Sequence, residues 1–194
     1  MRRKTRAAPR SKLVTMAFSI REAAKTDVEG IVRVVHSVYD EYGFTWDVEE
    51  YHADLYDPEG HFDRFWVAED GDILGVVGIC IHDPIPGILG EMALVDGVVR
   101  AAGSDCSLER LYVHPDARRR GIGDALTRKV IEHAASTGRR AIELWSDKRF
   151  GDAHRLYGRF GAVTVGERIC HDPDQSPEWG MIVVIEGEAP RIDG

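Results

Sequence analysis

Residues 108–123 read LERLYVHPDARRRGIG, and the order of elements in this stretch indicates the fold class. The part up to Val113 has the pattern of a β-strand, and His114 and Pro115 end that strand. Apolar residues at helical spacing then predict a helix over 121–137. A chain that leaves a strand and enters a helix in this way presents unpaired backbone amides at the helix start. These amides predict an anion-binding site.

The loop before this helix is suited to a diphosphate. Gly121 and Gly123 let the backbone approach a pyrophosphate closely, and the three arginines at 118–120 add positive charge. A glycine pair at a helix start also occurs as structural packing without a ligand. No Walker A motif is present, and a Rossmann fingerprint would need Gly or Ala where Leu126 stands. Glu143, at the distance of a ribose-binding acid, lies inside an apolar run and not at a strand end.

The rest of the chain predicts a mixed α/β domain with a strand, helix, strand crossover. Thr26 and Glu29 form a predicted capping box, from which a helix runs to Gly43. The pattern weakens over 83–105, where one strand is expected within 91–100. The other expected elements are strands over 18–21, 62–69, 73–81, 107–113, 141–145, 162–169 and 178–185, and helices over 46–56, 121–137 and 153–160.

Composition and charge limit the class of protein. A chain of 194 residues with 43% hydrophobic content suits one domain, and a net charge of −8 argues against a general nucleic-acid binder. Residues 1–15 hold six basic and no acidic residues, which leaves 19 basic against 33 acidic residues beyond them. We expect 1–15 to be a disordered basic tail, 16–188 the folded domain and 189–194 a C-terminal tail. Met16 is an alternative start of the protein.

Neither a membrane nor a metal partner is expected. No apolar run reaches the ~18 residues of a membrane span, and the basic start is not followed by the apolar core of a signal peptide. We therefore expect a cytoplasmic protein. Cys80, Cys106 and Cys170 lack zinc-site spacing, and the polar residues at 171–174 lack metal-ligand spacing.

Two motifs resemble the GNAT superfamily of acetyl-CoA-dependent N-acetyltransferases. The strand 108–113 followed by Arg118-x-x-Gly121-x-Gly123 is similar to the family's signature strand and cofactor loop, whose motif is Gln/Arg-x-x-Gly-x-Gly/Ala. Residues 153–162, AHRLYGRFGA, resemble the family's later helix with its Leu-Tyr pair and its basic-aromatic-Gly ending. Two motifs in this order are more specific than one, and the order of elements over 18–185 is also similar.

The resemblance implies a fold and an acyl donor. The implied fold is α/β, a single GNAT domain with a mixed central β-sheet flanked by helices on both faces. The implied co-substrate is acetyl-CoA. Its contacts are expected from the signature strand and the loop amides, with Arg118 as the positional match to the loop motif: Leu111, Tyr112, Val113, Arg118, Arg119, Arg120, Gly121, Ile122, Gly123 and Asp124.

Acyl transfer to an amine needs a proton acceptor, a polarised carbonyl and a proton for the leaving thiolate. Family members often place a glutamate where this chain has Ser107, so the sequence departs from the pattern there. Glu109 lies two residues on, points to the same strand face and is the candidate base, acting through water; a solvated or salt-bridged carboxylate is the competing interpretation. Tyr157 matches a tyrosine that in resembling enzymes lies near the cofactor sulfur, although it also fits as a core residue. By resemblance, the amide of Val113 polarises the carbonyl.

Three other residues stay open as the base, namely Glu91, Asp105 and His114. Cys106 invites a covalent intermediate, but no His or Asp context activates it, so direct attack of the amine on the thioester is expected.

The acceptor is the least defined part of the prediction. Aromatic residues gather where the first two expected helices join, and there the family commonly builds its acceptor pocket, although core packing explains part of them. We predict acetylation of a primary amine of a small molecule. The alternatives are acetylation of a protein N-terminus or lysine, and a non-catalytic acyl-CoA-binding module. The sequence fixes no oligomeric state, and a homodimer is compatible with it. The aromatic residues are Tyr39, Tyr42, Phe44, Trp46, Tyr51 and His52.

Overall fold

A seven-stranded mixed sheet organises residues 18–185, which are the residues that the computed structural model describes. The predicted tails and the alternative start at Met16 lie outside this range. The strand order is β1-β2-β3-β6-β7-β9-β8, and within this range β6 and β7 form the one parallel pair. The strands are β1 (Ser19–Glu22), β2 (Arg64–Asp70), β3 (Asp72–Ile81), β6 (Cys106–Val113), β7 (Ala141–Asp147), β8 (Val163–Ile169) and β9 (Pro177–Val184).

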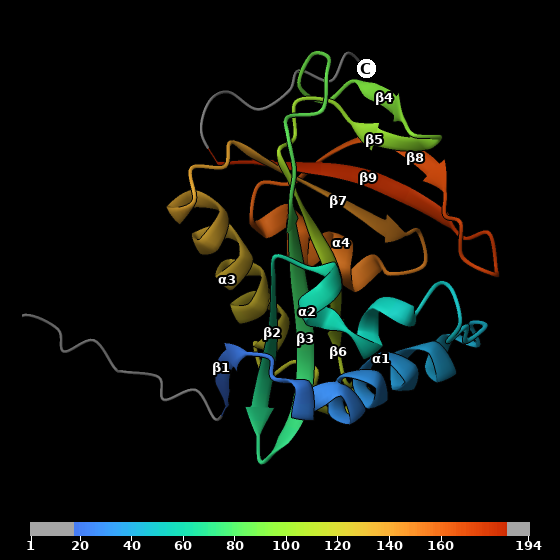
Figure 1. Ribbon diagram of the computed structural model, residues 1–194, viewed down its shortest axis with the longest axis vertical. Coiled ribbons are helices and arrows are strands. Elements are labelled where there is room, and N and C mark those ends of the chain that lie inside the picture. The colour runs from blue at the N-terminus through green and yellow to red at the C-terminus, as the bar shows by residue number, and fades with distance from the viewer. Residues whose placement is uncertain (1–17, 186–194) are drawn as a thin grey trace, which may run out of the picture.

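Helices cover both faces of the sheet, as predicted (Figure 1). On one face, α3 (Ile122–Ser136) and α4 (Gly151–Arg159) enclose the larger core. On the other face, α1 (Val28–Tyr42) packs on β2 and β3, followed by the short helices η2 (Ala53–Tyr56) and α2 (Pro58–His61). The two-residue alternation of β2 serves both cores, because Trp66 faces α3 and Phe65 faces α1.

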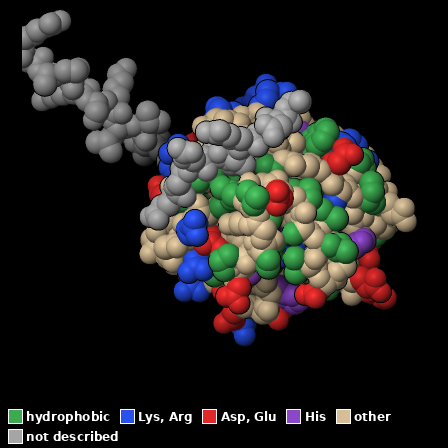
Figure 2. Space-filling view, turned by 90° about the horizontal axis from the view of Figure 1, so that it is seen from above, with side chains coloured by type: hydrophobic (Ala, Val, Ile, Leu, Met, Phe, Trp, Pro, Cys, Tyr) green, Lys and Arg blue, Asp and Glu red, His purple; other side chains and the backbone are tan. Residues whose placement is uncertain are grey.

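A separate hairpin, β4 (Met92–Val95) and β5 (Val98–Ala101), contacts β8 and β9 through β5. The expectation of one strand over 91–100 is wrong, because Asp96 and Gly97 both take positive φ, 49° and 82°, and form a tight hairpin turn. Arg100 pairs with the buried Glu143 of β7 and thereby fastens the hairpin to the sheet. From above, Figure 2 shows hydrophobic side chains between scattered charges on this end of the molecule.

Two further expectations are wrong near α1. Residues 46–56 do not form one continuous helix. The Asp47 carboxylate accepts hydrogen bonds from the amides of Glu49 and Glu50, and this turn, which competes with a helical backbone, leaves only the short helix η2 at the end of the range. The Thr26 capping box is also absent, since α1 begins at Val28. The Asp27 carboxylate instead accepts the amide of Ala24 at 2.7 Å and pairs with an arginine of β1.

The sheet splits at its centre. Strands β6 and β7 pair only over Cys106–Leu108, against residues 142–144, and β6 then continues to Val113 without a partner on that side. Figure 1 shows the result, because β2, β3 and β6 stand together while β7, β9 and β8 fan away from them. The split leaves the β7 side of 109–113 without a strand partner, and this stretch includes residues 111–113, which the sequence predicts to meet the cofactor.

Candidate active site

A β-bulge at Arg110 and Leu111 shapes the site. Glu109 pairs with Gly78 and Tyr112 with Val76, so two residues of β6 lie opposite Val77 alone. Arg110 takes a φ of +52°, a left-handed conformation that is costly for a residue with a side chain. The extra residue shifts the alternation, so Tyr112 packs toward α1, whereas Leu111 and Val113 pack toward α3 and α4.

Two residues of the loop before α2 hold the bulged arginine. The Arg110 guanidinium donates to the Asp54 carboxylate from Nε at 2.8 Å and from a terminal nitrogen at 3.1 Å. It also donates to the carbonyl of Tyr51 and lies 4.5 Å from the centre of that ring. Asp54 therefore neutralises the charge of Arg110, and the contacts with Asp54 and Tyr51 stabilise the left-handed backbone at this residue.

A cavity of about 470 Å³ lies where the sequence predicts the donor, between α1, the loop before α3 and α4. Leu111, Tyr112 and Val113 line it from β6, and all the expected loop residues except Arg120 line it from the other side. Gly121 takes a φ of +83°, and a Cβ there would meet no atom within 4 Å, so the space above it is open. Ile122, Gly123 and Asp124 at the start of α3 line this cavity, and the unpaired amides of a helix start suit an anion.

The three arginines of the loop take different positions. Arg118 lines the cavity while donating two hydrogen bonds to Glu41 of α1. Arg119 is exposed and also lines the cavity. Arg120 lies outside it and pairs with Asp70 at 2.9 Å.

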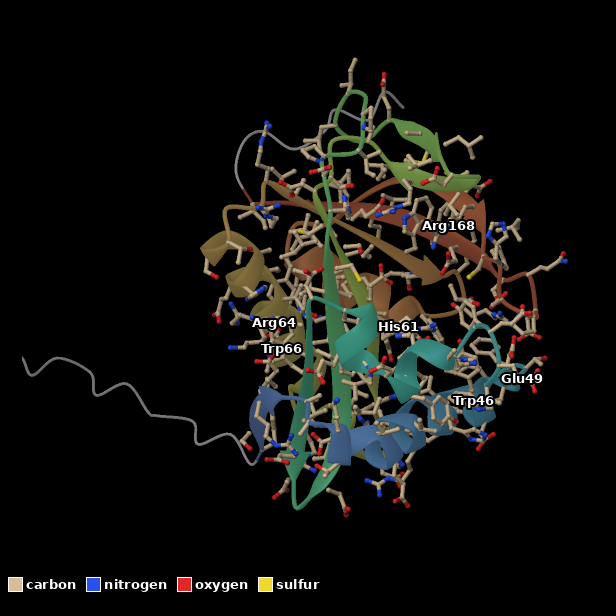
Figure 3. All side chains as sticks on the ribbon, viewed as in Figure 1. Trp46, Glu49, His61, Arg64, Trp66 and Arg168 are labelled. Atoms are coloured by element: carbon tan, nitrogen blue, oxygen red, sulfur yellow. The ribbon has the colours of Figure 1, made fainter. Side chains whose placement is uncertain are left out.

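A second cavity, of about 370 Å³, opens on the α1 face of the split sheet. It lies between the α1–α2 segment and the loop that joins β8 to β9, and both candidate catalytic residues line it. In Figure 3, His61 of α2 and Arg168 of β8 lie on opposite sides of this region, and both line the cavity. Four residues line both cavities: Leu111, Tyr112, Phe150 and Ala153. The cavities therefore meet at the β-bulge.

Glu109 lies half-buried in the wall of the second cavity. Burial raises the pKa of its carboxyl above the ordinary value, and a hydrogen bond from Ser107 opposes part of that shift. Ser107 and Glu109 lie two residues apart on β6 before the bulge, so strand alternation places them on one face. A carboxylate with a raised pKa is better suited to accept a proton near neutral pH.

Tyr157 is buried in α4 and lines the same cavity from the opposite face of the sheet, through the split. Burial raises the pKa of its phenol, and the nearby Tyr112 and Glu109 raise it further. The phenol is therefore protonated at neutral pH and can act as a proton donor.

The residues left open as alternative bases lie elsewhere. Glu91 accepts a hydrogen bond from the amide of Ile88, and Asp105 accepts the amides of Arg140 and Ala141 at the start of β7. His114 accepts the amide of Asp116 in the turn after β6. Their side chains fill structural roles, and none of the three lines either cavity described above.

Cys106 is also outside both cavities. It is fully buried in the core between the sheet and helices α3 and α4, and burial raises the pKa of its thiol to about 12. A thiol that keeps its proton is a poor nucleophile.

The aromatic cluster divides between the two cavities and the core. Tyr39, Phe44 and Tyr51 line the second cavity, and Tyr42 lines the first. Trp46 and His52 stack behind them with ring centroids 3.9 Å apart. Of the six residues in the predicted aromatic cluster, three therefore line the second cavity and one lines the first.

Several cavity residues have no signal in the sequence. Arg168 donates to Glu178 at 2.7 Å and lies 4.2 Å from the Trp145 ring centroid, and these residues come from three strands. Phe150 precedes α4 and lines both cavities. The order of β7, β9 and β8 in the sheet brings Trp145, Glu178 and Arg168 together.

Two absences concern residues 18–185 only. No group of three or more His, Cys, Asp or Glu side chains in that range is arranged to hold a metal ion. No helix in the same range is long and apolar enough to cross a membrane.

Comparisons with known proteins agree with this geometry. The model of the acetyltransferase (GNAT) family matches residues 31–162, which is more than half of the chain. An uncharacterized N-acetyltransferase of Methanocaldococcus jannaschii is 44% identical over 54 residues, which are 28% of this chain and about a quarter (24%) of that protein's length.

Solved structures share the fold. A GNAT-family acetyltransferase from Staphylococcus aureus Mu50 is 18% identical with a TM-score of 0.66, over 87% of this chain and 99% of that one. A GNAT-family acetyltransferase from Brucella melitensis in complex with acetyl-CoA is 20% identical with a TM-score of 0.59, over 91% and 93% of the two chains. By its sequence motifs, its split sheet and the family match over 31–162, the chain belongs to the acetyltransferase (GNAT) family of enzymes.

Proposed function

We propose that this enzyme transfers an acetyl group from acetyl-CoA to a primary amine of a small molecule, by direct attack of the amine on the thioester. The observation that carries this proposal is the meeting of the two cavities at four shared residues. A donor in one cavity and an amine in the other would come together there. Glu109 and Tyr157 both lie on the amine side of this meeting point.

The residues of the donor cavity fit acetyl-CoA. The amides of Ile122, Gly123 and Asp124 and the open space above Gly121 suit the pyrophosphate. Arg119 supplies positive charge at the same place. The backbone of 111–113 has free hydrogen-bonding groups on the β7 side for the pantetheine amides. When bound, acetyl-CoA supplies the activated acetyl group.

Glu109 is proposed to take the proton from the attacking ammonium group, directly or through water. Its raised pKa brings the carboxylate closer to the pH at which a general base works best. Ser107 favours the charged form of this carboxyl, so we assign this serine the role of positioning the base instead of replacing it.

Tyr157 is proposed to donate a proton to the leaving thiolate. The phenol lies across the split sheet from Glu109, so base and acid approach the meeting point from opposite faces. A buried Cys106 outside both cavities supports direct attack over a covalent acyl-enzyme.

The size and lining of the acceptor cavity support a small amine. About 370 Å³ lies in the range of small-molecule sites, which is ~300–1,000 Å³. Asp174 of the β8–β9 loop accepts the amide and the hydroxyl of Thr45, both at 2.8 Å, and so ties together the two segments that border the cavity.

The test is CoA release and acetyl-amine formation with two acceptor panels, one of small primary amines and one of peptides with free N-termini or lysines. Mass spectrometry should follow the acetylated product, because the half-buried Cys80 adds its own signal to thiol reagents. Acetylation of small amines alone supports the proposal. Acetylation of peptides alone would replace the acceptor class, and tight CoA binding without turnover on either panel would favour the non-catalytic alternative.

A further inference from the structure

Phe150 occupies the junction between the two cavities. It directly precedes α4, its side chain is half-buried, and it lines both the donor and the acceptor cavity. The sequence assigns it no role. The ring is the bulkiest apolar group among the four shared residues, and Ala153 is the smallest.

Three aromatic rings hold Phe150 in this position. Tyr42 meets it edge to face at 4.8 Å between centroids, Phe44 at 5.7 Å and Tyr112 at 6.4 Å. These partners come from the end of α1, the segment after it and the β-bulge. A ring fixed by three edge-to-face contacts does not move aside at low cost.

The position of the reacting carbon follows from the two cavities. The amine nitrogen and the thioester carbon must approach within ~3–3.5 Å, so the carbonyl lies where the cavities meet. An acyl chain held at that point has Leu111, Tyr112, Ala153 and Phe150 as its neighbours, because these four residues line both cavities. The Phe150 ring limits the space on that side.

We propose that Phe150 determines the length of the acyl group that the enzyme accepts, and that its ring excludes chains longer than acetyl. This inference rests on the proposed function, because it assumes that the donor is an acyl-CoA. It makes Phe150 a specificity-determining residue for the donor and leaves the proton transfers to Glu109 and Tyr157.

The test compares Phe150→Ala and Phe150→Leu with the unchanged enzyme on acetyl-, butyryl- and hexanoyl-CoA. Two quantities are measured: kcat/KM with one fixed amine, and the Kd of each donor by calorimetry without amine. A single methylene in an apolar pocket is worth about 10-fold or more in discrimination. We expect the acetyl-to-butyryl ratio to fall at least about 10-fold in Phe150→Ala, with Phe150→Leu between the two.

The matched control is Phe160→Ala, which removes the same ring at the other end of α4, under Arg128 and away from both cavities. Its donor ratios should stay within twofold of the unchanged enzyme. The inference would be overturned if Phe150→Ala changed kcat/KM by the same factor for all three donors. It would also be overturned if the unchanged enzyme had the same Kd for acetyl-, butyryl- and hexanoyl-CoA.

Two failures stay distinguishable. If the unchanged enzyme binds acyl-CoA but acetylates no amine, the proposed function fails while the Kd ratios still test Phe150. If Phe150→Ala does not fold by circular dichroism, the conservative Phe150→Leu must still shift the ratio, and an unshifted ratio there counts against the inference.

Discussion

Arg118 and Glu41 are joined by two hydrogen bonds, from one terminal guanidinium nitrogen at 2.8 Å and from the other at 2.5 Å. The pair connects the loop before α3 to the last turn of α1, beside the donor cavity that Val38 and Tyr42 also line. The arginine that the sequence assigns to the diphosphate is therefore already neutralised by a carboxylate. This arrangement places a negative charge next to the proposed diphosphate site.

Removing that charge should strengthen donor binding. In Glu41→Gln, Arg118 loses its ionic partner and the repulsion between Glu41 and a diphosphate disappears. Since both side chains are partly exposed, the gain is modest, about 1 kcal/mol or a three- to tenfold lower Kd for acetyl-CoA. Titration calorimetry at low and high salt measures it, and the gain should shrink at high salt.

A matched control for this prediction is Asp70→Asn, because Asp70 pairs with Arg120 outside the cavity and should leave the Kd unchanged. Arg118→Gln should weaken binding. If Glu41→Gln weakened binding as well, the pair would act by holding the loop against α1 and not by tuning charge.

Glu109→Gln should lower kcat by ~10²–10⁴-fold, because the amide cannot accept the proton of the ammonium group. The Kd of acetyl-CoA should not change, since Glu109 lines only the acceptor cavity. Because burial raises the pKa of this carboxyl, kcat/KM of the unchanged enzyme should fall as the pH drops through that raised pKa. The variant should lose this acidic limb, and a variant with full rate and an unaltered pH profile would exclude Glu109 as the base.

Tyr157→Phe keeps the packing of α4 and removes only the hydroxyl. We expect kcat to fall roughly 10²-fold or more while the Kd of acetyl-CoA and the melting temperature stay near those of the unchanged enzyme. Steady-state kinetics with thermal denaturation measures both. Full turnover would leave Tyr157 as a core residue, which its burial alone also explains.

His52 should make stability depend on pH. It is fully buried between Trp46, Tyr39 and Tyr51, and its Nε2 is the one buried side-chain nitrogen or oxygen within 18–185 that lacks a hydrogen-bond partner. Burial lowers the pKa of this imidazole from 6.5 to about 4. Between these values the unfolded chain binds a proton that the folded chain does not, so the free energy of unfolding falls as the pH drops, by ~2 kcal/mol from pH 7 to pH 5.

Urea denaturation at the two pH values measures this difference. His52→Phe should lose the ~2 kcal/mol pH dependence of the free energy of unfolding, because the titrating imidazole is gone. It should also be less stable at pH 7, because it gives up the Nδ1 hydrogen bond to the Asp47 carbonyl. His171→Phe, on an exposed loop, is the matched control and should keep the dependence. If the unchanged enzyme, His52→Phe and His171→Phe all lost the same free energy of unfolding between pH 7 and pH 5, the pH dependence would belong to groups other than His52.

The sequence contains the donor half of the site almost completely. Gly121 and Gly123, the strand up to Val113 and the helix after it are contiguous, so local pattern and backbone conformation identify them. The Leu-Tyr pair of α4 is equally local. The hairpin turn at Asp96 and Gly97 is local as well, because an Asp-Gly pair at this spacing is a hairpin signal.

The acceptor half depends on contacts between distant segments. Strict alternation along β6 would put Leu111 on the face of Glu109, and the bulge at Arg110 puts Tyr112 there instead. Asp54, 56 residues away, holds that bulge. The family and the fold class follow from the sequence alone, and so does the prediction of a donor loop, because these rest on short-range patterns. Which side chains line the proposed acceptor cavity depends on the tertiary structure, because a one-residue shift in strand register exchanges the two faces of a sheet.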